Sequence, residues 1–475
     1  MKFGTSGLRG LVADMTDAVV AGYVLAFLAH LAGEGRPAAF VLVGRDLRPS
    51  SPGIAAACRA AIRAAGVDAV DCGALPTPAL ALEAAAQGAP AIMVTGSHIP
   101  FDRNGLKFYR PEGEITKADE AGILAARGRV PAPAARPGGE RADAQALSRY
   151  RARNLDFLGQ DALAGLTIGV HQHSAVGRDL IADALSSLGA RIVALGRADV
   201  FVPVDTEAVS AEDAEQARIW AAEHRLDALV TTDGDGDRPL IADERGVFLR
   251  GDVVGLLAAR SLGADAVATP ISSSTALERS GWVARVARTR IGSPFVIEAL
   301  ERLAAEGARL PVGYEANGGF LLGAPAPAPG GGTIAPLPTR DALLPMLALL
   351  GEAARRTAPL SALVAEAPAR VTASDRLTGI GAERSGPFLE TLAADPAVQK
   401  RLARAIGVEA VLSVNALDGV RLTLSGDEIA HLRASGNAPE LRGYAEAADP
   451  DRAVALVARL LAAARAELDR PRDGR

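Results

Sequence analysis

Residues 40–73 read FVLVGRDLRPSSPGIAAACRAAIRAAGVDAVDCG, and this stretch indicates the architecture of the chain. An apolar, β-branched run is followed by a turn of small residues, an alanine-rich segment with helical spacing, a glycine and a second apolar run. This order is typical of a βαβ unit. The same pattern starts again near Leu166 and near Ala264. We therefore expect three related α/β domains.

The C-terminal part has a different pattern. Residues 408–425, VEAVLSVNALDGVRLTLS, alternate apolar and polar positions around Asp418-Gly419, which predicts a β-hairpin. A third strand (428–435) and a terminal helix from about Asp451 follow. The fold class expected is thus α/β, with three βαβ-type domains and a C-terminal α+β domain around a central cleft. The domains expected are 1–150, 151–255, 256–365 and 366–475, and the proline- and glycine-rich segments 130–143 and 323–333 are expected to be a linker and a loop.

Composition excludes several classes of protein. The 475 residues include 51 basic and 56 acidic side chains, for a net charge of −5, which argues against nucleic acid or an anionic membrane as a partner. The longest nearly apolar run, residues 18–32, contains His30 and is too short to cross a membrane, so it is expected to be a buried helix. With only two cysteines and no apolar N-terminal leader, the chain is expected in the cytoplasm.

A serine follows a predicted buried strand in residues 94–109, VTGSHIPFDRNGLKFY. Ser97 stands at the carboxyl end of that strand, where open α/β sheets bind ligands, and its hydroxyl could be a nucleophile. Lys107, ten residues later, is one of four lysines in an arginine-rich chain. The alternative is a strand–turn in which the serine only caps the backbone.

Three aspartates alternate with glycines in residues 229–241, LVTTDGDGDRPLI. Asp233, Asp235 and Asp237 would repel one another unless a hard cation such as Mg²⁺ or Ca²⁺ lay between them. An EF-hand is disfavoured because a strand precedes the loop and Arg238 stands where that motif has glycine. A solvated acidic turn is the other alternative. Arg238 suggests a phosphate beside the metal.

Two further loops carry polar groups between glycines. Glu315 and Asn317, in PVGYEANGGFLLG (311–323), could bind vicinal sugar hydroxyls, or could simply end a strand. Residues 431–447, HLRASGNAPELRGYAEA, could cradle a phosphate, or could form a charged hairpin end. The candidate residues of this fourth loop are Arg433, Ser435, Gly436, Asn437 and Arg442. With one such loop in each expected domain, the four together predict a single site for a phosphorylated sugar.

These motifs resemble the α-D-phosphohexomutase family over essentially the whole chain, from FGTSGLRG at Phe3 through TGSH…NGLK to DGDGDR. The resemblance implies a four-domain enzyme that uses Mg²⁺ and a hexose 1,6-bisphosphate. It implies that Ser97 is a phosphoserine and metal ligand, and that Asp233, Asp235 and Asp237 complete the metal site. The other roles that it implies are general acid/base catalysis by Lys107, a catalytic position for His98, neutralisation of phosphate by Arg9 and Arg238, and substrate binding by Glu315, Asn317, Arg290 and residues 433–439.

The chain departs from the common family pattern at three places. His98 precedes Ile99 instead of Asn-Pro, the third loop has Glu-Ala-Asn-Gly-Gly-Phe instead of Glu-x-Ser-Gly-His, and the fourth has Arg-Ala-Ser-Gly-Asn-Ala-Pro instead of Thr-Glu-Pro. The last two lie at substrate-reading positions. The motifs GYEANGGF and ASGNAPELR resemble most a bacterial phosphomannomutase subgroup.

The expected reaction interconverts mannose 1-phosphate, glucose 1-phosphate or both with the 6-phosphates. Phosphorylated Ser97 would hold the group, and Lys107, with its pKa lowered by nearby cations, would take the proton of the attacking hydroxyl. The alternatives are a phosphoglucosamine mutase, a metal-dependent sugar phosphatase and a non-catalytic sugar-phosphate sensor. The enzyme is expected to be a monomer or a dimer.

Overall fold

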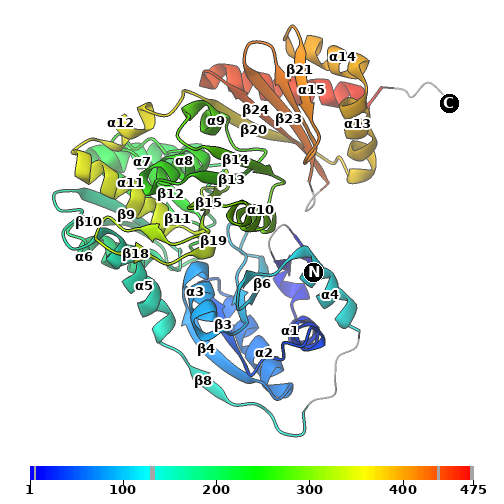
Figure 1. The fold of residues 1–475 in the computed structure, drawn as a ribbon. Helices are drawn as coiled ribbons and strands as arrows, with labels where there is room; N and C mark the ends of the chain where they lie inside the picture. The colour runs from blue at the N-terminus through cyan, green and yellow to red at the C-terminus, as the bar shows by residue number, and fades with distance from the viewer. Residues whose placement is uncertain (5–6, 129–133, 436–438, 471–475) are drawn as a thin grey trace. The chain divides into compact units, whose positions relative to one another are not determined.

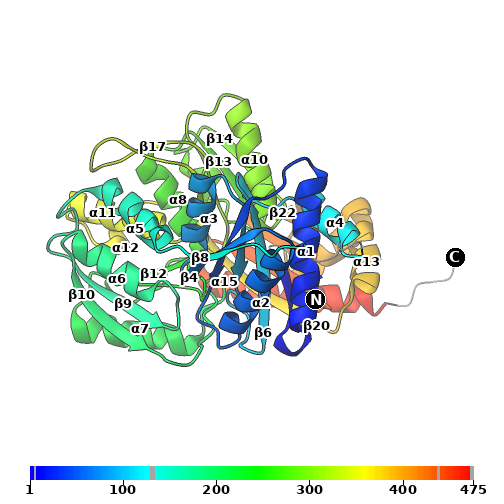
Figure 2. The same ribbon diagram turned by 90° about the horizontal axis from the view of Figure 1, so that it is seen from below.

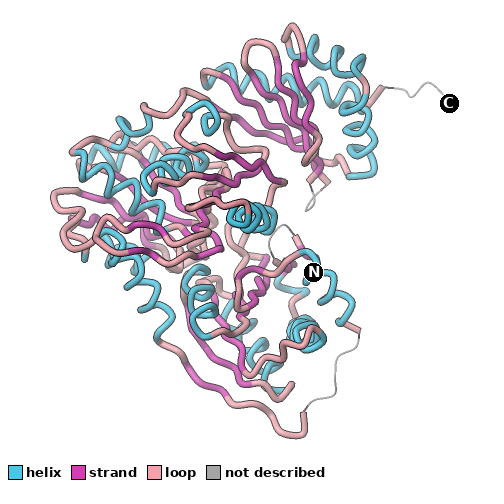
Figure 3. Tube along the Cα trace, in the orientation of Figure 1, coloured by secondary structure: helices cyan, strands magenta, loops and turns pink. Residues whose placement is uncertain are grey.

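The computed structural model describes residues 1–4, 7–128, 134–435 and 439–470, which form two compact units. Unit 1 comprises residues 1–268 and 292–366, and unit 2 comprises residues 269–291 and 367–475. Helices and strands alternate along most of the chain (Figures 1 and 3). The multidomain α/β fold class expected from the sequence is confirmed, whereas the four domain boundaries and the central cleft stay predictions.

The first sheet of unit 1 has the strand order β1-β2-β6-β5-β3-β4-β8, with β7 on β6. Its strands are β1 (Lys2–Phe3), β2 (Leu8–Leu11), β3 (Phe40–Arg45), β4 (Asp68–Ala74), β5 (Ala91–Val94), β6 (Arg103–Arg110), β7 (Gly113–Glu114) and β8 (Glu140–Ala142). The helical segments are η1 (Val12–Asp14), α1 (Asp17–Gly33), α2 (Ser51–Ala64), α3 (Thr77–Gln87) and α4 (Lys117–Ala126). Strand β3 lies parallel to both β4 and β5, which confirms the first βαβ unit.

Helix α1 covers the apolar run expected to be a buried helix. The Thr16 hydroxyl caps its N-terminus, and Figure 2 shows α1 beside α2. Phe27 of α1 packs on Phe108 of β6 with ring centroids 4.9 Å apart, and both rings are buried. Burying each such ring stabilises the fold by about 2–3 kcal/mol. The core therefore fixes the strand that carries Lys107.

The second sheet has the order β10-β9-β11-β12. Its elements are α5 (Gln145–Leu158), β9 (Thr167–His173), α6 (Arg178–Ser187), β10 (Arg191–Arg197), α7 (Ala211–His224), β11 (Ala228–Thr232) and β12 (Pro239–Ala242). Strands β9 and β10 are parallel, as the second βαβ unit requires, whereas β11 and β12 are an antiparallel pair. The aspartate-rich segment is the loop between β11 and β12.

The third sheet contains β13, β15, β16 and β19 in that order. The elements of this region are α8 (Gly251–Leu262), β13 (Ala266–Pro270), α10 (Ser293–Ala305), β15 (Pro311–Tyr314), β16 (Phe320–Leu322), β17 (Ala326–Pro327), β18 (Thr333–Ile334), β19 (Leu337–Asp341), α11 (Leu343–Arg356) and α12 (Leu360–Ala365). Strands β15 and β16 are antiparallel, and the loop between them carries Glu315 and Asn317.

Unit 2 is built on an antiparallel sheet with the order β20-β24-β23-β22-β21. Its elements are α9 (Ala276–Ser280), β14 (Arg285–Thr289), β20 (Val371–Thr378), α13 (Ala382–Ala394), α14 (Pro396–Ile406), β21 (Val411–Asn415), β22 (Val420–Leu424), β23 (Glu428–Ala434), β24 (Glu440–Ala447) and α15 (Pro450–Leu468). The predicted hairpin, third strand and terminal helix are all present.

Three features differ from the sequence-based expectation. The segment expected to be a linker ends in β8, which pairs with β4 and extends the first sheet. The proline-rich loop contains the short β17–β18 pair. Residues 269–291, most of the third βαβ pattern, belong to unit 2, where Glu446 of β24 accepts hydrogen bonds from the backbone and hydroxyl of Thr275. No helix in the described part of the chain is long and apolar enough to span a membrane.

Candidate active site

Ser97 lies in a tight loop directly after β5. Its backbone has φ of 54°, in the left-handed region that costs a non-glycine residue roughly 1 kcal/mol or more. Its N–H donates to the Thr95 hydroxyl over 2.8 Å, and its side chain is buried. The loop thus holds the hydroxyl in one defined position.

Arg48 stabilises the loop that carries Ser97. Because β3 and β5 are parallel neighbours, the segments after them meet at one edge of the sheet. The buried guanidinium donates to the carbonyl oxygens of Ser97, Ile99, Pro100 and Arg103 at 2.5–2.9 Å. It also stacks on the Phe201 ring, 4.0 Å from the centroid. A single side chain therefore fixes most of the backbone around Ser97.

We expect Arg48→Met to lower the free energy of unfolding by about 3 kcal/mol or more, because buried carbonyl groups lose their donor. Urea titration monitored by circular dichroism measures this loss. Arg218→Met is the control, since Arg218 is exposed and pairs with Glu215 on its own helix. Equal unfolding midpoints for the two variants would contradict the account of Arg48.

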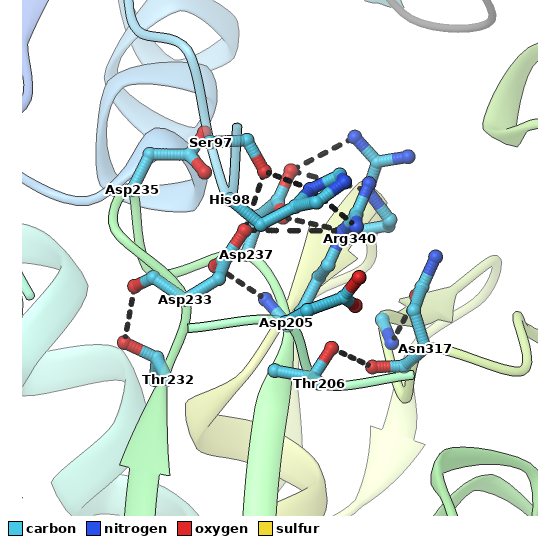
Figure 4. A network of polar contacts seen from close by, with 12 residues as sticks. Ser97, His98, Asp205, Thr206, Thr232, Asp233, Asp235, Asp237, Asn317 and Arg340 are labelled. Atoms are coloured by element: carbon cyan, nitrogen blue, oxygen red, sulfur yellow. Dashed lines mark hydrogen bonds and ion pairs between the residues drawn. The ribbon is translucent and has the colours of Figure 1, made fainter. Parts of the chain in front are cut away.

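The three aspartates of the β11–β12 loop converge on Ser97 (Figure 4). Asp233, Asp235 and Asp237 are buried, and one carboxylate oxygen of each lies within 4.8 Å of the others. The Ser97 hydroxyl donates to Asp233 Oδ2 over 2.5 Å. Gly234 permits this approach, because a Cβ there would lie 2.9 Å from the Ser97 carbonyl oxygen.

Lys107 and Arg340 neutralise part of this negative charge. Lys107 Nζ lies 2.6 Å from Asp235 Oδ2 and 2.6 Å from Asp237 Oδ2. Arg340 Nη2 lies 2.8 Å from Asp237 Oδ2. Burial alone would raise the pKa of Asp237, but Arg340, Lys107 and Arg238 hold it well below its usual range. For Asp233, burial and the other two aspartates raise the pKa far above its usual value.

The pKa of Lys107 differs from the expectation. Burial favours the neutral amine, but the carboxylates of Asp235 and Asp237 outweigh it and raise the pKa above its ordinary value. The expected lowering by neighbouring cations is therefore wrong for this arrangement. Lys107 is an ammonium group that donates to two aspartates.

Two carboxylate oxygens of the triad make the site suitable for a cation. Asp235 Oδ2 accepts from the Thr77 hydroxyl at 2.5 Å and from Lys107, whereas its buried Oδ1 has no hydrogen-bond partner among the described residues. Asp237 is similar: its Oδ2 accepts from Lys107 and Arg340, and its buried Oδ1 accepts no hydrogen bond from a described residue, although Arg238 Nε lies 3.6 Å from it. Buried carboxylate oxygens without donors are costly unless a cation binds them. The triad is therefore able to hold a metal ion.

His98, Arg238 and Arg9 surround the same point. His98 Nδ1 lies 3.3 Å from Ser97 Oγ and accepts from Arg238 Nη1 at 2.9 Å. Burial and the two guanidinium groups lower the pKa of His98 to about 2, so the ring is neutral at physiological pH. Burial, Arg238 and Arg340 lower the pKa of Arg9 to about 10. The structure thus brings together the four residues expected to be catalytic, which are Ser97, His98, Lys107 and Arg9.

Glu315 and Asn317 belong to the same group of polar contacts. Glu315 Oε2 accepts from Arg340 Nη1 over 3.0 Å. Asn317 Oδ1 accepts from the Gly319 backbone, and the Asn317 carbonyl accepts from the Thr206 hydroxyl at 2.8 Å (Figure 4). The Asn317 side chain therefore shapes the loop, while Arg340 joins Glu315 to Asp237.

The remaining expected residues lie in unit 2. Asp418 accepts from Arg433 Nε at 3.0 Å and from the backbone N–H of Ile291 at 2.9 Å. It therefore brings the turn that carries Arg290 close to Arg433. Ser435 follows β23, and Arg442 lies on β24 opposite Arg433. Gly436 and Asn437 lie outside the described residues.

Arg48, Thr77 and Arg340 were not predicted as site residues from the sequence. Arg48 and Thr77 each follow a strand of the first sheet, a position that could have marked them. Arg340 stands in TRD, directly before an apolar helix, where an arginine reads as an ordinary surface residue. Nothing local to it signals a contact with Asp237, 103 residues earlier in the chain.

Comparison with known proteins identifies the family of this chain. The family models described as phosphoglucomutase/phosphomannomutase alpha/beta/alpha domain I, alpha/beta/alpha domain III and C-terminal domain match residues 1–129, 250–371 and 382–463. A phosphomannomutase of Sinorhizobium fredii is 47% identical over 97% of this chain and 98% of its own length. The chain belongs to the α-D-phosphohexomutase family. It is an isomerase of the phosphoryl-transferring mutase class, as the sequence motifs indicated.

Other relatives of this phosphohexomutase extend over the same length. A phosphomannomutase of Salmonella muenchen is 44% identical over 99% of this chain and 97% of its own length. The structure of a phosphoglucomutase/phosphomannomutase family protein from Burkholderia thailandensis superimposes with a TM-score of 0.75 at 21% identity, covering 97% of each chain. That likeness shows the shared fold across both units of the phosphohexomutase.

Proposed function

We propose that this phosphohexomutase interconverts mannose 1-phosphate, glucose 1-phosphate or both with the corresponding 6-phosphates. In this proposal Ser97 carries the transferred phosphoryl group, Mg²⁺ is the metal, and a hexose 1,6-bisphosphate is the intermediate and activator. The observation that carries it is the hydrogen bond from Ser97 Oγ to Asp233, inside a buried triad in which two carboxylate oxygens accept no hydrogen bond from a described residue. Phosphoryl transfer requires a nucleophile beside a bound cation, and this hydrogen bond holds the Ser97 hydroxyl at such a position.

The residues around Ser97 supply the charge that a phosphoserine needs. A phosphorylated Ser97 would bring a dianion beside Asp233, and the two would repel without a cation between them. All three aspartates offer hard oxygen ligands, which suit Mg²⁺. Arg238 Nε is buried, lies 3.6 Å from Asp237 Oδ1 and donates no hydrogen bond to any described residue, so its N–H would donate to a phosphoryl oxygen on Ser97. We propose that Arg9 neutralises the same group.

In the first transfer a sugar hydroxyl oxygen forms a bond to phosphorus, the P–Oγ bond of Ser97 breaks, and the hydroxyl gives up its proton. In the second transfer the P–Oγ bond forms again, the bond from phosphorus to the other sugar oxygen breaks, and that oxygen receives a proton. Asp233, Asp235 and Asp237 would hold Mg²⁺, which would supply positive charge to the transferring group. Lys107, whose burial favours the neutral amine, would then exchange that proton with the sugar hydroxyl. His98 stays neutral and fixes Arg238. The loop of Glu315 and Asn317 would bind the sugar ring, while Arg290, Arg433, Ser435, Gly436, Asn437 and Arg442 would bind the phosphate that does not react.

The choice of mannose or glucose rests on the curated relatives. Both relatives named above are phosphomannomutases, and both match almost the entire chain. A phosphoglucosamine mutase would be expected to carry serine and histidine in the third loop, where this chain has Asn317 and Gly319. We also propose a cytoplasmic location, because Cys58 and Cys72 are both buried free thiols. Whether the enzyme is a monomer or a dimer stays a prediction.

The test is a substrate panel. The purified protein receives Mg²⁺, a trace of hexose 1,6-bisphosphate and one of three substrates: mannose, glucose or glucosamine 1-phosphate. We expect 6-phosphate from the first two, with a lower kcat/KM for glucosamine 1-phosphate and no release of inorganic phosphate. Phosphate release without isomerisation would identify a phosphatase instead. A preference for glucosamine 1-phosphate would overturn the substrate assignment.

A further inference from the structure

Arg340 bridges two parts of the site that the sequence separates. It stands next to the last residue of β19, and its side chain is only 2% exposed. The guanidinium donates through Nε and Nη2 to Asp237 Oδ2, at 3.1 Å and 2.8 Å, and through Nη1 to Glu315 Oε2 at 3.0 Å. Figure 4 shows Arg340 reaching toward Asp237. One rigid, planar group therefore sets the position of a carboxylate in the metal triad and of a carboxylate in the sugar loop.

The sugar loop is shaped to admit this arginine. A Cβ at position 319 would lie 2.4 Å from Arg340 Cδ and 2.7 Å from Cγ, so only glycine leaves room for the aliphatic part of the side chain. Gly319 also closes the loop, because its N–H donates to Asn317 Oδ1 and its carbonyl accepts from the Glu315 N–H. Gly319 occupies the position where the common family motif has histidine. Arg340 and Gly319 thus fit one another sterically.

We propose that Arg340 is a positioning residue that determines which hexose phosphates this enzyme binds, by fixing Glu315 relative to the reacting centre, and that Gly319 is its obligatory partner. The inference rests on the proposed function, because it takes Glu315 as a ligand of the sugar hydroxyls. With Oε2 held by Arg340, Oε1 is the Glu315 oxygen presented to the sugar. Without the guanidinium, the Glu315 carboxylate is free to adopt other rotamers, and discrimination between hexoses is lost.

The fork of the guanidinium is essential to this role. An arginine can donate to two carboxylates at once in a fixed geometry, whereas a lysine presents a single flexible ammonium group. Arg340→Lys keeps the positive charge beside Asp237 but cannot bridge to Glu315 in the same way. If Arg340 acts only as a countercharge, lysine will substitute for it. If it acts through position, lysine will not restore the selectivity between hexoses.

The experiment measures binding of mannose, glucose and glucosamine 1-phosphate by isothermal titration calorimetry in the presence of a chelator, so that no turnover occurs. We expect Arg340→Ala and Arg340→Lys to weaken binding of the preferred hexose phosphate by about tenfold and to level the ranking of the three. Gly319→Ala should do the same while keeping Arg340. The double variant G319A/R340A should be no worse than Arg340→Ala alone, because the added methyl group then has no Cδ to displace.

Arg153→Met is the matched control. Arg153 is another buried arginine, and it pairs with Asp341, the residue that follows Arg340 on β19. Thermal unfolding of every variant shows which of them fold. An unchanged ranking in Arg340→Lys and Gly319→Ala, or additive losses in the double variant, would overturn the proposal.

The binding data separate this inference from the proposed function. A wild-type enzyme that ranks hexose phosphates but fails to isomerise them would contradict the proposed function alone, and the coupling of Arg340 to Gly319 would still be measurable. A wild-type chain that binds none of the three would overturn both.

Discussion

Ser97→Ala is expected to abolish isomerisation, with a loss in kcat on the order of 10⁴-fold or more. The hydroxyl is the only group of this residue that can carry a phosphoryl group between two positions of a sugar. Alanine removes it and leaves the Asp233 carboxylate without that donor. The loop itself should persist, since Arg48 holds its carbonyl groups and not the side chain. The rate is measured with the proposed preferred substrate, Mg²⁺ and the activating bisphosphate.

The control for this loss is Ser385→Ala. Ser385 is also buried, but it lies in α13 of unit 2 and donates to the Gly381 carbonyl. This variant should keep nearly all activity. Substantial isomerisation by Ser97→Ala would show that no phosphoserine at this position takes part.

Asp235→Asn is expected to lower the metal-dependent rate by at least about a hundredfold. The substitution keeps the shape of the side chain and its contact with Thr77, but it removes one negative charge from the cation site. Affinity for Mn²⁺, used as a probe in place of Mg²⁺, should fall as well. Titration calorimetry of Mn²⁺ and the rate as a function of Mg²⁺ concentration measure the two effects.

The matched control for the metal loop is Asp243→Asn. Asp243 is equally buried and follows β12 of the same hairpin, but its partners are Arg245 and backbone N–H groups. Its loss should leave Mn²⁺ affinity unchanged. If Asp235→Asn retains high activity after chelation, the aspartate triad is not the metal site.

The chemistry-bearing loops were predictable because each one is local in sequence. A serine directly after a buried strand, and three aspartates spaced by glycines, can be recognised in the sequence without knowing which residues they contact. The parallel arrangement of β3 and β4 followed from the βαβ pattern alone. The convergence of Ser97, Lys107 and the triad was expected from the four loops taken together and from the family resemblance, because Ser97 and the triad follow strands of different sheets. Their roles in catalysis stay predictions.

What could not be predicted depends on long-range contacts. The pKa of Lys107 was expected to be lowered by nearby cations. In the structure its nearest groups are the carboxylates of Asp235 and Asp237, which are 128 and 130 residues away in sequence. Arg340 was missed for the same reason, since no local sequence pattern indicates that it binds both Asp237 and Glu315. The assignment of residues 269–291 to unit 2 likewise depends on partners such as Glu446.

The most direct measurement of the central claim is the mass of the intact protein before and after incubation with a hexose 1,6-bisphosphate and Mg²⁺. We predict the addition of one phosphoryl group, which peptide mapping places on Ser97. Addition of a hexose 6-phosphate should then remove that group from the protein and produce the bisphosphate. A chain that takes up no phosphoryl group, takes it up at another residue or releases it as inorganic phosphate faster than it transfers it would contradict the account.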